Sequence, residues 1–255
     1  MMATKGVDRW SLTKGHPAVI GGSLRFRRVV NSALACALAC AASAGVWAAQ
    51  GHAITLDEVL VHLDDSAKGF RSLSANIEKT KVTIVVNDHS TESGTLLVRG
   101  DKMLLQMTAP APQTILRTGD NIYVYTPGLK RVEEYNLGKN RDLADEFLLL
   151  GFGTSGKELQ KGFEIKLVGE DKLGDKKDVE LELAPKSASV KNQISKIQIW
   201  LDQTTWLPDQ QQVTENGSGD YFVMRYTKMV RNPDIPDSQF KQHWPKGTEH
   251  IKPQG

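Results

Sequence analysis

The stretch that decides the fold is Val179–Leu183, which reads VELEL and alternates aliphatic with acidic residues. Successive side chains of a β-strand point to opposite faces, so this pattern predicts a strand with one apolar and one polar face. The same alternation recurs near residues 165–167, 197–201 and 222–226. Half-buried strands of this kind are typical of antiparallel sheets.

Turn sequences separate these strands at the spacing of β-hairpins. They are rich in Gly, Asn, Asp and Pro, the residues that tight turns select, as in Gly100-Asp101, Gly119-Asp120-Asn121 and Gly174-Asp175. From Leu73 onward the pattern accommodates about ten or eleven strands. We therefore predict a mainly β (α+β) fold with a curved sheet or barrel, and not a parallel α/β fold.

Two segments have helical periodicity instead. Thr55–Phe70 repeats apolar residues at helical spacing, which predicts an amphipathic helix packed on the sheet. Asn140–Leu150 is the second such segment, and its apolar face consists of Leu143, Phe147 and Leu150. Because a curved sheet needs a cover for its apolar face, we predict that this segment is a lid. A cavity for a ligand with hydrocarbon character would result, although a filled core produces the same alternation.

The first 49 residues differ in composition from the rest. They hold six basic residues and one acidic residue, which leaves 26 basic and 29 acidic residues for positions 50–255. Arg25, Arg27 and Arg28 precede the apolar stretch Val29–Trp47, as in a secretory signal peptide, and cleavage is expected near Ala49. A retained N-terminal anchor is the alternative. We expect an exported, periplasmic protein whose mildly acidic mature part has no basic surface for nucleic acid.

The sequence contains no recognisable catalytic or metal-binding motif. Gly151–Lys157 resembles a phosphate-binding loop, but Glu158 occupies the place of the Ser or Thr that holds magnesium, so we interpret the loop as a hinge. Both cysteines, Cys36 and Cys40, lie in the N-terminal apolar stretch, and no histidine pair has metal-ligand spacing. We predict a protein that is not an enzyme and has no metal and no cofactor. A hydrolase is a distant alternative.

Several segments, taken in order, resemble the outer-membrane lipoprotein carrier and sorting proteins, the LolA family. Gly119–Pro127 is similar to a hairpin of that family with the pattern D-G-x-x-aromatic-x-Y-x-P. Gly94–Met107, which Pro110 and Pro112 follow, is similar to its strand pair ending in proline. Further segments are Asp142–Leu150, at the place of the family's lid helix, and Trp200–Asp202 with Leu207-Pro208, as in the sorting proteins. The likeness extends from about Thr55 to Pro236.

The resemblance implies an incomplete antiparallel β-barrel that an N-terminal helix and a short lid helix cover. Such a carrier would be a monomer that takes acylated lipoproteins or lipids from an inner-membrane ABC transporter to an outer-membrane acceptor. Its cavity would hold the acyl chains by apolar burial, at about 0.8 kcal/mol for each methylene. The domains would be an N-terminal extension and signal peptide (1–49), a carrier domain (50–236) and a polar C-terminal tail (237–255).

The alternating strands supply candidates for the lining of the cavity. These are Leu96, Val98, Met103, Leu105, Ile122 and Val124, with Leu143, Phe147 and Leu150 as the lid. The family's lid-closing arginine stands before a proline that this chain lacks, so Arg99 is the gating candidate, with Lys102 or a different closure as alternatives. A periplasmic sensor or regulatory binding protein on the same scaffold is the rival function. The sequence shows no second domain, which favours the carrier.

Overall fold

The computed structural model of the protein describes residues 53–138 and 150–253. All of the described elements belong to one compact unit. The predicted lid residues Leu143 and Phe147 lie outside the described residues, as does the predicted signal peptide. Within the described ranges, no helix is long and apolar enough to cross a membrane.

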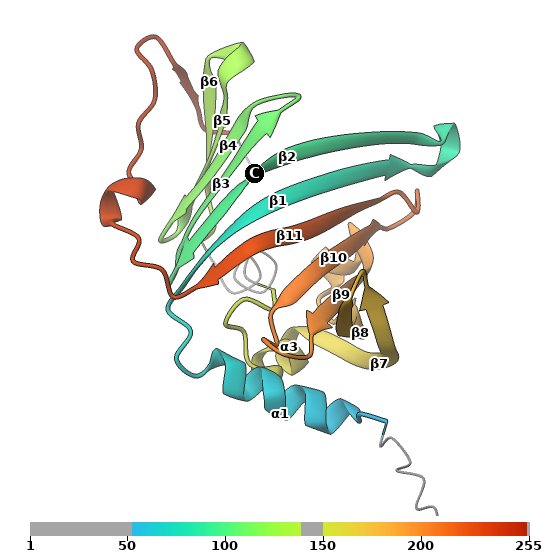
Figure 1. The fold of residues 1–255 in the computed structure, drawn as a ribbon. Coiled ribbons are helices and arrows are strands. Elements are labelled where there is room, and N and C mark those ends of the chain that lie inside the picture. The colour runs from blue at the N-terminus through green and yellow to red at the C-terminus, as the bar shows by residue number, and fades with distance from the viewer. Residues whose placement is uncertain (1–52, 139–149, 254–255) are drawn as a thin grey trace, which may run out of the picture. The chain divides into compact units, whose positions relative to one another are not determined.

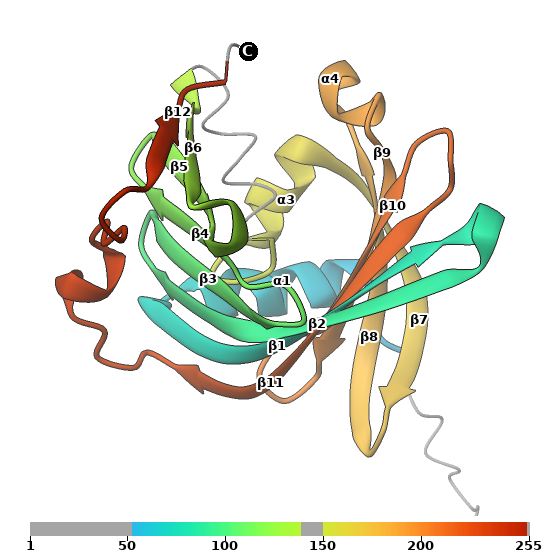
Figure 2. The same ribbon diagram turned by 90° about the horizontal axis from the view of Figure 1, so that it is seen from above.

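A single sheet dominates the described chain, and it is strongly curved and unclosed (Figures 1 and 2). Its order is β12-β6-β5-β4-β3-β2-β1-β11-β10-β9-β8-β7, and every neighbouring pair is antiparallel except β12 with β6. The strands are β1 (Ser72–Thr83), β2 (Asp88–Arg99), β3 (Lys102–Ala109), β4 (Gln113–Thr118), β5 (Asn121–Thr126), β6 (Arg131–Asn136), β7 (Phe163–Leu173), β8 (Lys176–Pro185), β9 (Ile194–Asp202), β10 (Pro208–Glu215), β11 (Tyr221–Arg231) and β12 (Glu249–Ile251). The predicted fold class, an incomplete antiparallel barrel, is confirmed.

Helix α1 (Leu56–Ala67) packs on one side of this sheet, which we call the inner face (Figure 2). The side chain of Thr55 accepts a hydrogen bond from the Glu58 amide, and the Glu58 carboxylate accepts one from the Thr55 amide at 2.8 Å. This capping box satisfies amides that the first turn leaves without helical partners. Val59, Leu60 and Leu63 are buried against β7–β10, so the predicted amphipathic helix is confirmed.

Helix α3 (Gly156–Gly162) begins inside the glycine-rich loop that we interpreted as a hinge. Ser155 and Glu158 form a second capping box, in which the Glu158 carboxylate accepts the Ser155 amide at 2.8 Å. Glu158, the residue that argued against a phosphate site, therefore belongs to the capping box at the N-terminus of α3. A Cβ at Gly156 would lie 2.8 Å from the Leu60 carbonyl oxygen, so α1 and α3 approach each other closely only with glycine here. The remaining described α-helix is the short α4 (Ala188–Lys191).

The C-terminal segment crosses the opposite side of the sheet, the outer face. Its 3₁₀ helix η4 (Asp237–Phe240) buries Phe240, which packs with Leu104, Leu116 and Tyr123 of β3–β5. The Trp244 ring lies on Tyr125 with 5.1 Å between centroids, and β12 then pairs with β6. We expected a polar tail from residue 237, but these residues are part of the domain because their two aromatic side chains cover outer-face apolar surface.

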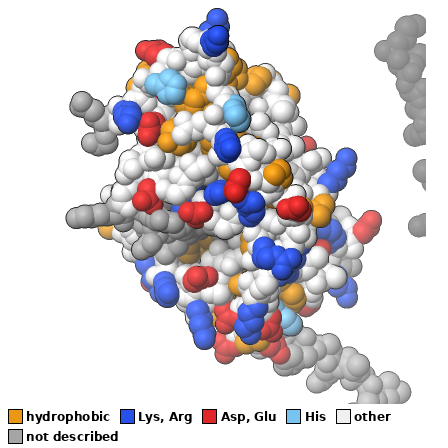
Figure 3. Space-filling model, turned by 90° about the vertical axis from the view of Figure 1, so that its left-hand side faces the viewer, with side chains coloured by type: hydrophobic (Ala, Val, Ile, Leu, Met, Phe, Trp, Pro, Cys, Tyr) orange, Lys and Arg blue, Asp and Glu red, His pale blue; other side chains and the backbone are white. Residues whose placement is uncertain are grey.

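Charged side chains are mixed on the side of the molecule that lies to the left in Figure 1. Figure 3 shows this side, where Lys and Arg alternate with Asp and Glu and no large patch of one sign is present. The C-terminal segment itself forms ion pairs of both kinds, with Asp237 bound to Lys102 at 2.6 Å and Lys252 bound to Glu134 at 3.5 Å. Such a surface offers no continuous basic stripe for a polyanion on this side.

Candidate functional site

The six predicted cavity residues lie on the same inner face, in rows that run across β1–β5. One row places Ala75, Leu96, Leu105, Ile115 and Val124 opposite one another in register. Directly opposed residues of an antiparallel pair have side chains about 5 Å apart, so the row is a continuous apolar strip. The alternate residues of β5, which are tyrosines, belong to the outer-face cluster.

Burial divides these residues into two groups. Leu96, Val98 and Met103 are buried in a cluster with Phe152 and Tyr226, so they are part of a filled core. Three others are only half-buried: Leu105, Ile122 and Val124. The apolar surface that remains accessible on this part of the inner face therefore lies toward β5.

Arg117 interrupts the second row, which contains Leu73, Val98, Met103 and Ile122 in register. Its side chain is fully buried, at 0% exposure. A guanidinium keeps its charge at every physiological pH, so the site has a fixed cation within an apolar surface. We did not select Arg117 from the sequence. Its position two residues after Ile115, on the apolar side of an alternating strand, was the signal that could have identified it.

A polar network attaches residues 150–153 to the inner face. The Tyr226 hydroxyl donates to Oε1 of Gln211 at 3.0 Å, and Nε2 of Gln211 donates to the Leu150 carbonyl at 2.6 Å. The Phe152 ring meets Tyr226 edge-on with 4.8 Å between centroids. Burial raises the pKa of the Tyr226 hydroxyl far above its ordinary value, so it remains a neutral donor. Leu150, the one predicted lid residue that the structure describes, is buried against the cluster of α1 and β7–β10.

Arg99 lies on the outer face, unlike its neighbour Val98. Its guanidinium donates to the Ile235 carbonyl and to the Asp237 carboxylate. Lys102, the alternative gating residue, donates to the same carboxylate at 2.6 Å. The hydrogen bond from Lys102 and the charge of Arg99 lower the pKa of Asp237. Both cations therefore hold the C-terminal segment on the sheet, and the gating role of Arg99 stays a prediction that these contacts do not favour.

The described residues contain no group of three or more His, Cys, Asp or Glu side chains that could hold a metal ion. The accessible part of the inner face is apolar in the described residues, and the Arg117 side chain is buried beneath it. Such a surface binds hydrocarbon groups by apolar burial and offers little to other classes of ligand.

A sequence model of the outer membrane lipoprotein carrier protein LolA matches residues 68–243. The chain belongs to the LolA family. An outer-membrane lipoprotein carrier protein of Dechloromonas aromatica (strain RCB) is 23% identical over 211 residues, which cover 78% of this chain and 88% of that relative. The family resemblance predicted from the sequence is confirmed.

Solved structures are also similar to this chain at low sequence identity. A conserved protein from Thermus thermophilus is 8% identical with a TM-score of 0.51, over 77% of this chain and 98% of that one. A LolA superfamily protein from Nitrosomonas europaea is 17% identical with a TM-score of 0.39, over 74% of this chain and 99% of that one. At these identities the likeness concerns the fold alone.

Proposed function

We propose that this LolA-family chain is a periplasmic carrier that binds acyl chains of lipoproteins or lipids on its inner face. It would ferry them from the inner to the outer membrane and would catalyse no reaction. The observation that carries the proposal is that Leu105, Ile122 and Val124 stay half-buried on the inner face, beside the buried cluster of Leu96, Val98 and Met103.

Apolar burial suits a carrier because it is strong enough to hold cargo and has no directional bonds to break on release. Each buried methylene contributes roughly 0.8 kcal/mol, so six of them supply about 5 kcal/mol. The proposal includes the lid that the sequence predicts. Phe147→Glu is expected to abolish acyl binding. Unchanged binding by this variant would contradict the predicted lid.

The experiment that tests the function is native mass spectrometry of the protein purified gently from the envelope of cells that produce the full chain. We expect a bound lipid or acylated peptide whose mass identifies the class of cargo. The proposal fails if the protein is bare and also takes up no fluorescent fatty acid. Co-purification of a stoichiometric membrane-protein domain without lipid would support the sensor instead.

A further inference from the structure

Strands β10 and β11 pair over only part of their lengths. Their ladder runs from Thr214 opposite Tyr221 to Gln210 opposite Arg225, whereas β11 continues to Arg231. Over this continuation β11 pairs with β1 on its other edge, where a bulge includes Lys228 in the left-handed conformation (φ 50°). The sheet therefore opens between the start of β10 and the second half of β11.

Two adjoining cavities occupy this opening, which we call the β10–β11 cleft. One, of about 480 Å³, lies between the β7–β8 turn, Asp209 and β11. The other, of about 330 Å³, lies between the β9–β10 turn and β11. They share Lys176, Tyr226, Thr227 and Lys228. Their combined size is that of a small-molecule site.

The apolar residues of the cleft also belong to the inner face. Leu207 and Tyr226 are buried members of the cluster that contains Leu96 and Val98, and Met229 packs against that cluster. The apolar lining of the cleft is therefore continuous with the buried cluster of the inner face.

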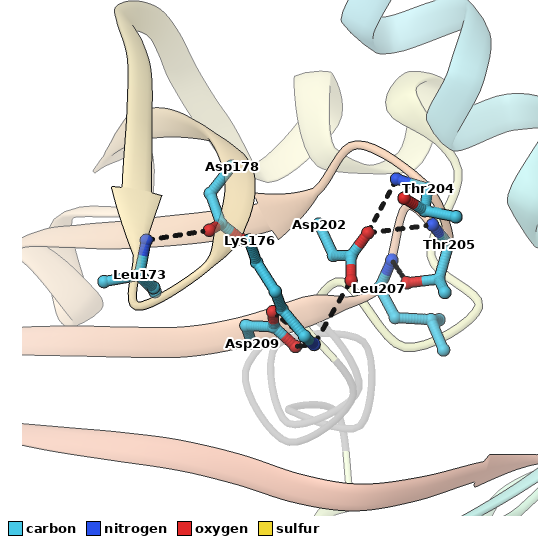
Figure 4. A network of polar contacts seen from close by, with 8 residues as sticks. All are labelled: Leu173, Lys176, Asp178, Asp202, Thr204, Thr205, Leu207 and Asp209. Atoms are coloured by element: carbon cyan, nitrogen blue, oxygen red, sulfur yellow. Dashed lines mark hydrogen bonds and ion pairs between the residues drawn. The ribbon is translucent and has the colours of Figure 1, made fainter.

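The carboxylates of the cleft are already engaged by protein groups (Figure 4). Lys176 donates to both oxygens of Asp209, at 2.8 and 2.7 Å, and its Nζ lies 3.2 Å from Asp202. Asp202 also accepts the amides of Thr204 at 2.6 Å and Thr205 at 3.2 Å. These bonds shape the wall of the cleft and occupy its carboxylates.

The cations of the cleft outnumber those carboxylates. Lys176, Arg225, Lys228 and Arg231 line it, against Asp202 and Asp209. Arg225 donates to Gln210 and lies 3.9 Å from the Glu78 carboxylate, and Arg231 donates to the Ser66 carbonyl. The Lys228 side chain is exposed, and its Nζ has no hydrogen bond or ion pair within residues 53–138 and 150–253. The cleft thus has one ammonium group, that of Lys228, available for an anion.

We propose that the β10–β11 cleft binds the anionic head group of a lipid whose hydrocarbon chain lies toward the inner face. The inference rests on the proposed function for the chain and adds a separate site for the head. Lys228 supplies the charge-assisted contact, and Leu207, Tyr226 and Met229 supply the apolar part of the lining, which belongs to the inner face.

Isothermal titration of the exported full-length protein with monomeric lysophospholipids tests this site. Lysophosphatidylglycerol and lysophosphatidylcholine of equal chain length differ in head-group charge, and glycerol 3-phosphate supplies an anionic head without a chain. Lys228→Asn removes the charge while keeping a residue that tolerates positive φ. Lys130→Asn is the matched control, because Lys130 is also exposed and left-handed (φ 46°) and does not line the cleft.

We expect the wild-type protein to prefer the anionic lipid by about tenfold and to bind glycerol 3-phosphate far more weakly. Lys228→Asn should remove the preference without weakening lysophosphatidylcholine, and Lys130→Asn should behave as wild type. Equal affinity of the wild type for the two lipids, or a preference that survives Lys228→Asn, would each overturn the site while leaving acyl binding intact. Equal affinity for the chainless anion would show that the chain contributes nothing, and would contradict the acyl binding of the proposed function as well. Binding of neither lipid would contradict the proposed function itself, and the inference with it.

Discussion

Replacing Tyr226 by Phe removes one hydroxyl from the inner face, and the surroundings of that hydroxyl determine the cost. Tyr226 and Gln211 are 5% and 4% exposed, so water cannot replace the lost donor to Oε1 of Gln211. Leaving one partner of a buried hydrogen bond unsatisfied costs about 1–3 kcal/mol. The aromatic ring stays in contact with Phe152, so no cavity adds to this cost. We expect a loss of about 2 kcal/mol, or a fall in Tm of about 4–8 °C for a domain of this size.

Urea denaturation followed by tryptophan fluorescence measures this loss. Tyr135→Phe is the control, because its hydroxyl bonds to Glu133 at the exposed surface and should cost less than about 0.5 kcal/mol. The double variant Tyr226→Phe/Gln211→Met should be more stable than the sum of the single variants by about 1 kcal/mol. Strict additivity, or a Tyr226→Phe cost no larger than that of the control, would refute the view that this network attaches residues 150–153.

Three further predictions concern separate parts of the protein. Val124→Glu should weaken binding of a fluorescent fatty acid by about tenfold or more because a carboxylate on the apolar strip resists desolvation; Leu129→Glu, in an exposed turn, should change it little. Phe240→Ala should cost about 3 kcal/mol in denaturation and increase hydrogen exchange in β12, and unchanged stability would contradict the packing of the C-terminal segment. Burial, together with neighbouring carboxylates, raises the pKa of Asp178 in the folded protein. The contribution of protonated Asp178 to folding stability is therefore complete below about pH 4 and is lost as the pH rises through the raised pKa. Asp178→Asn should therefore exceed wild type in stability by about 1 kcal/mol at neutral pH and match it near pH 4, and an equal offset at both pH values would exclude titration as the cause.

The fold could be predicted because its strands obey a local rule. Stretches such as Val179–Leu183 have one face on a core and one in water, so apolar and polar residues alternate along the chain and can be recognised from adjacent positions. The capped helix after Thr55 is equally local. The three-residue strand β12 is different, because it is held by Phe240 and Trp244, isolated aromatic residues with no periodicity around them.

The candidate site was only partly accessible to sequence reasoning. Alternation placed Leu96 and Val124 on one face, but it did not show that the first is filled core and the second half-exposed, which depends on distant Phe152. The Tyr226–Gln211 bond joins residues of neighbouring strands through a register that the sequence does not state. The β10–β11 cleft exists because the pairing of these two strands ends early, and no local sequence pattern predicts where strand pairing ends.

The central claim is that the inner face binds acyl chains by hydrocarbon burial, and a chain-length series tests it most directly. Saturated fatty acids of increasing length should be titrated into the delipidated protein by calorimetry under one set of conditions. The account predicts a binding free energy that grows by about 0.8 kcal/mol with each methylene until the strip is covered, together with a negative heat-capacity change. An affinity independent of chain length would contradict it, because the chain would then contribute nothing to recognition.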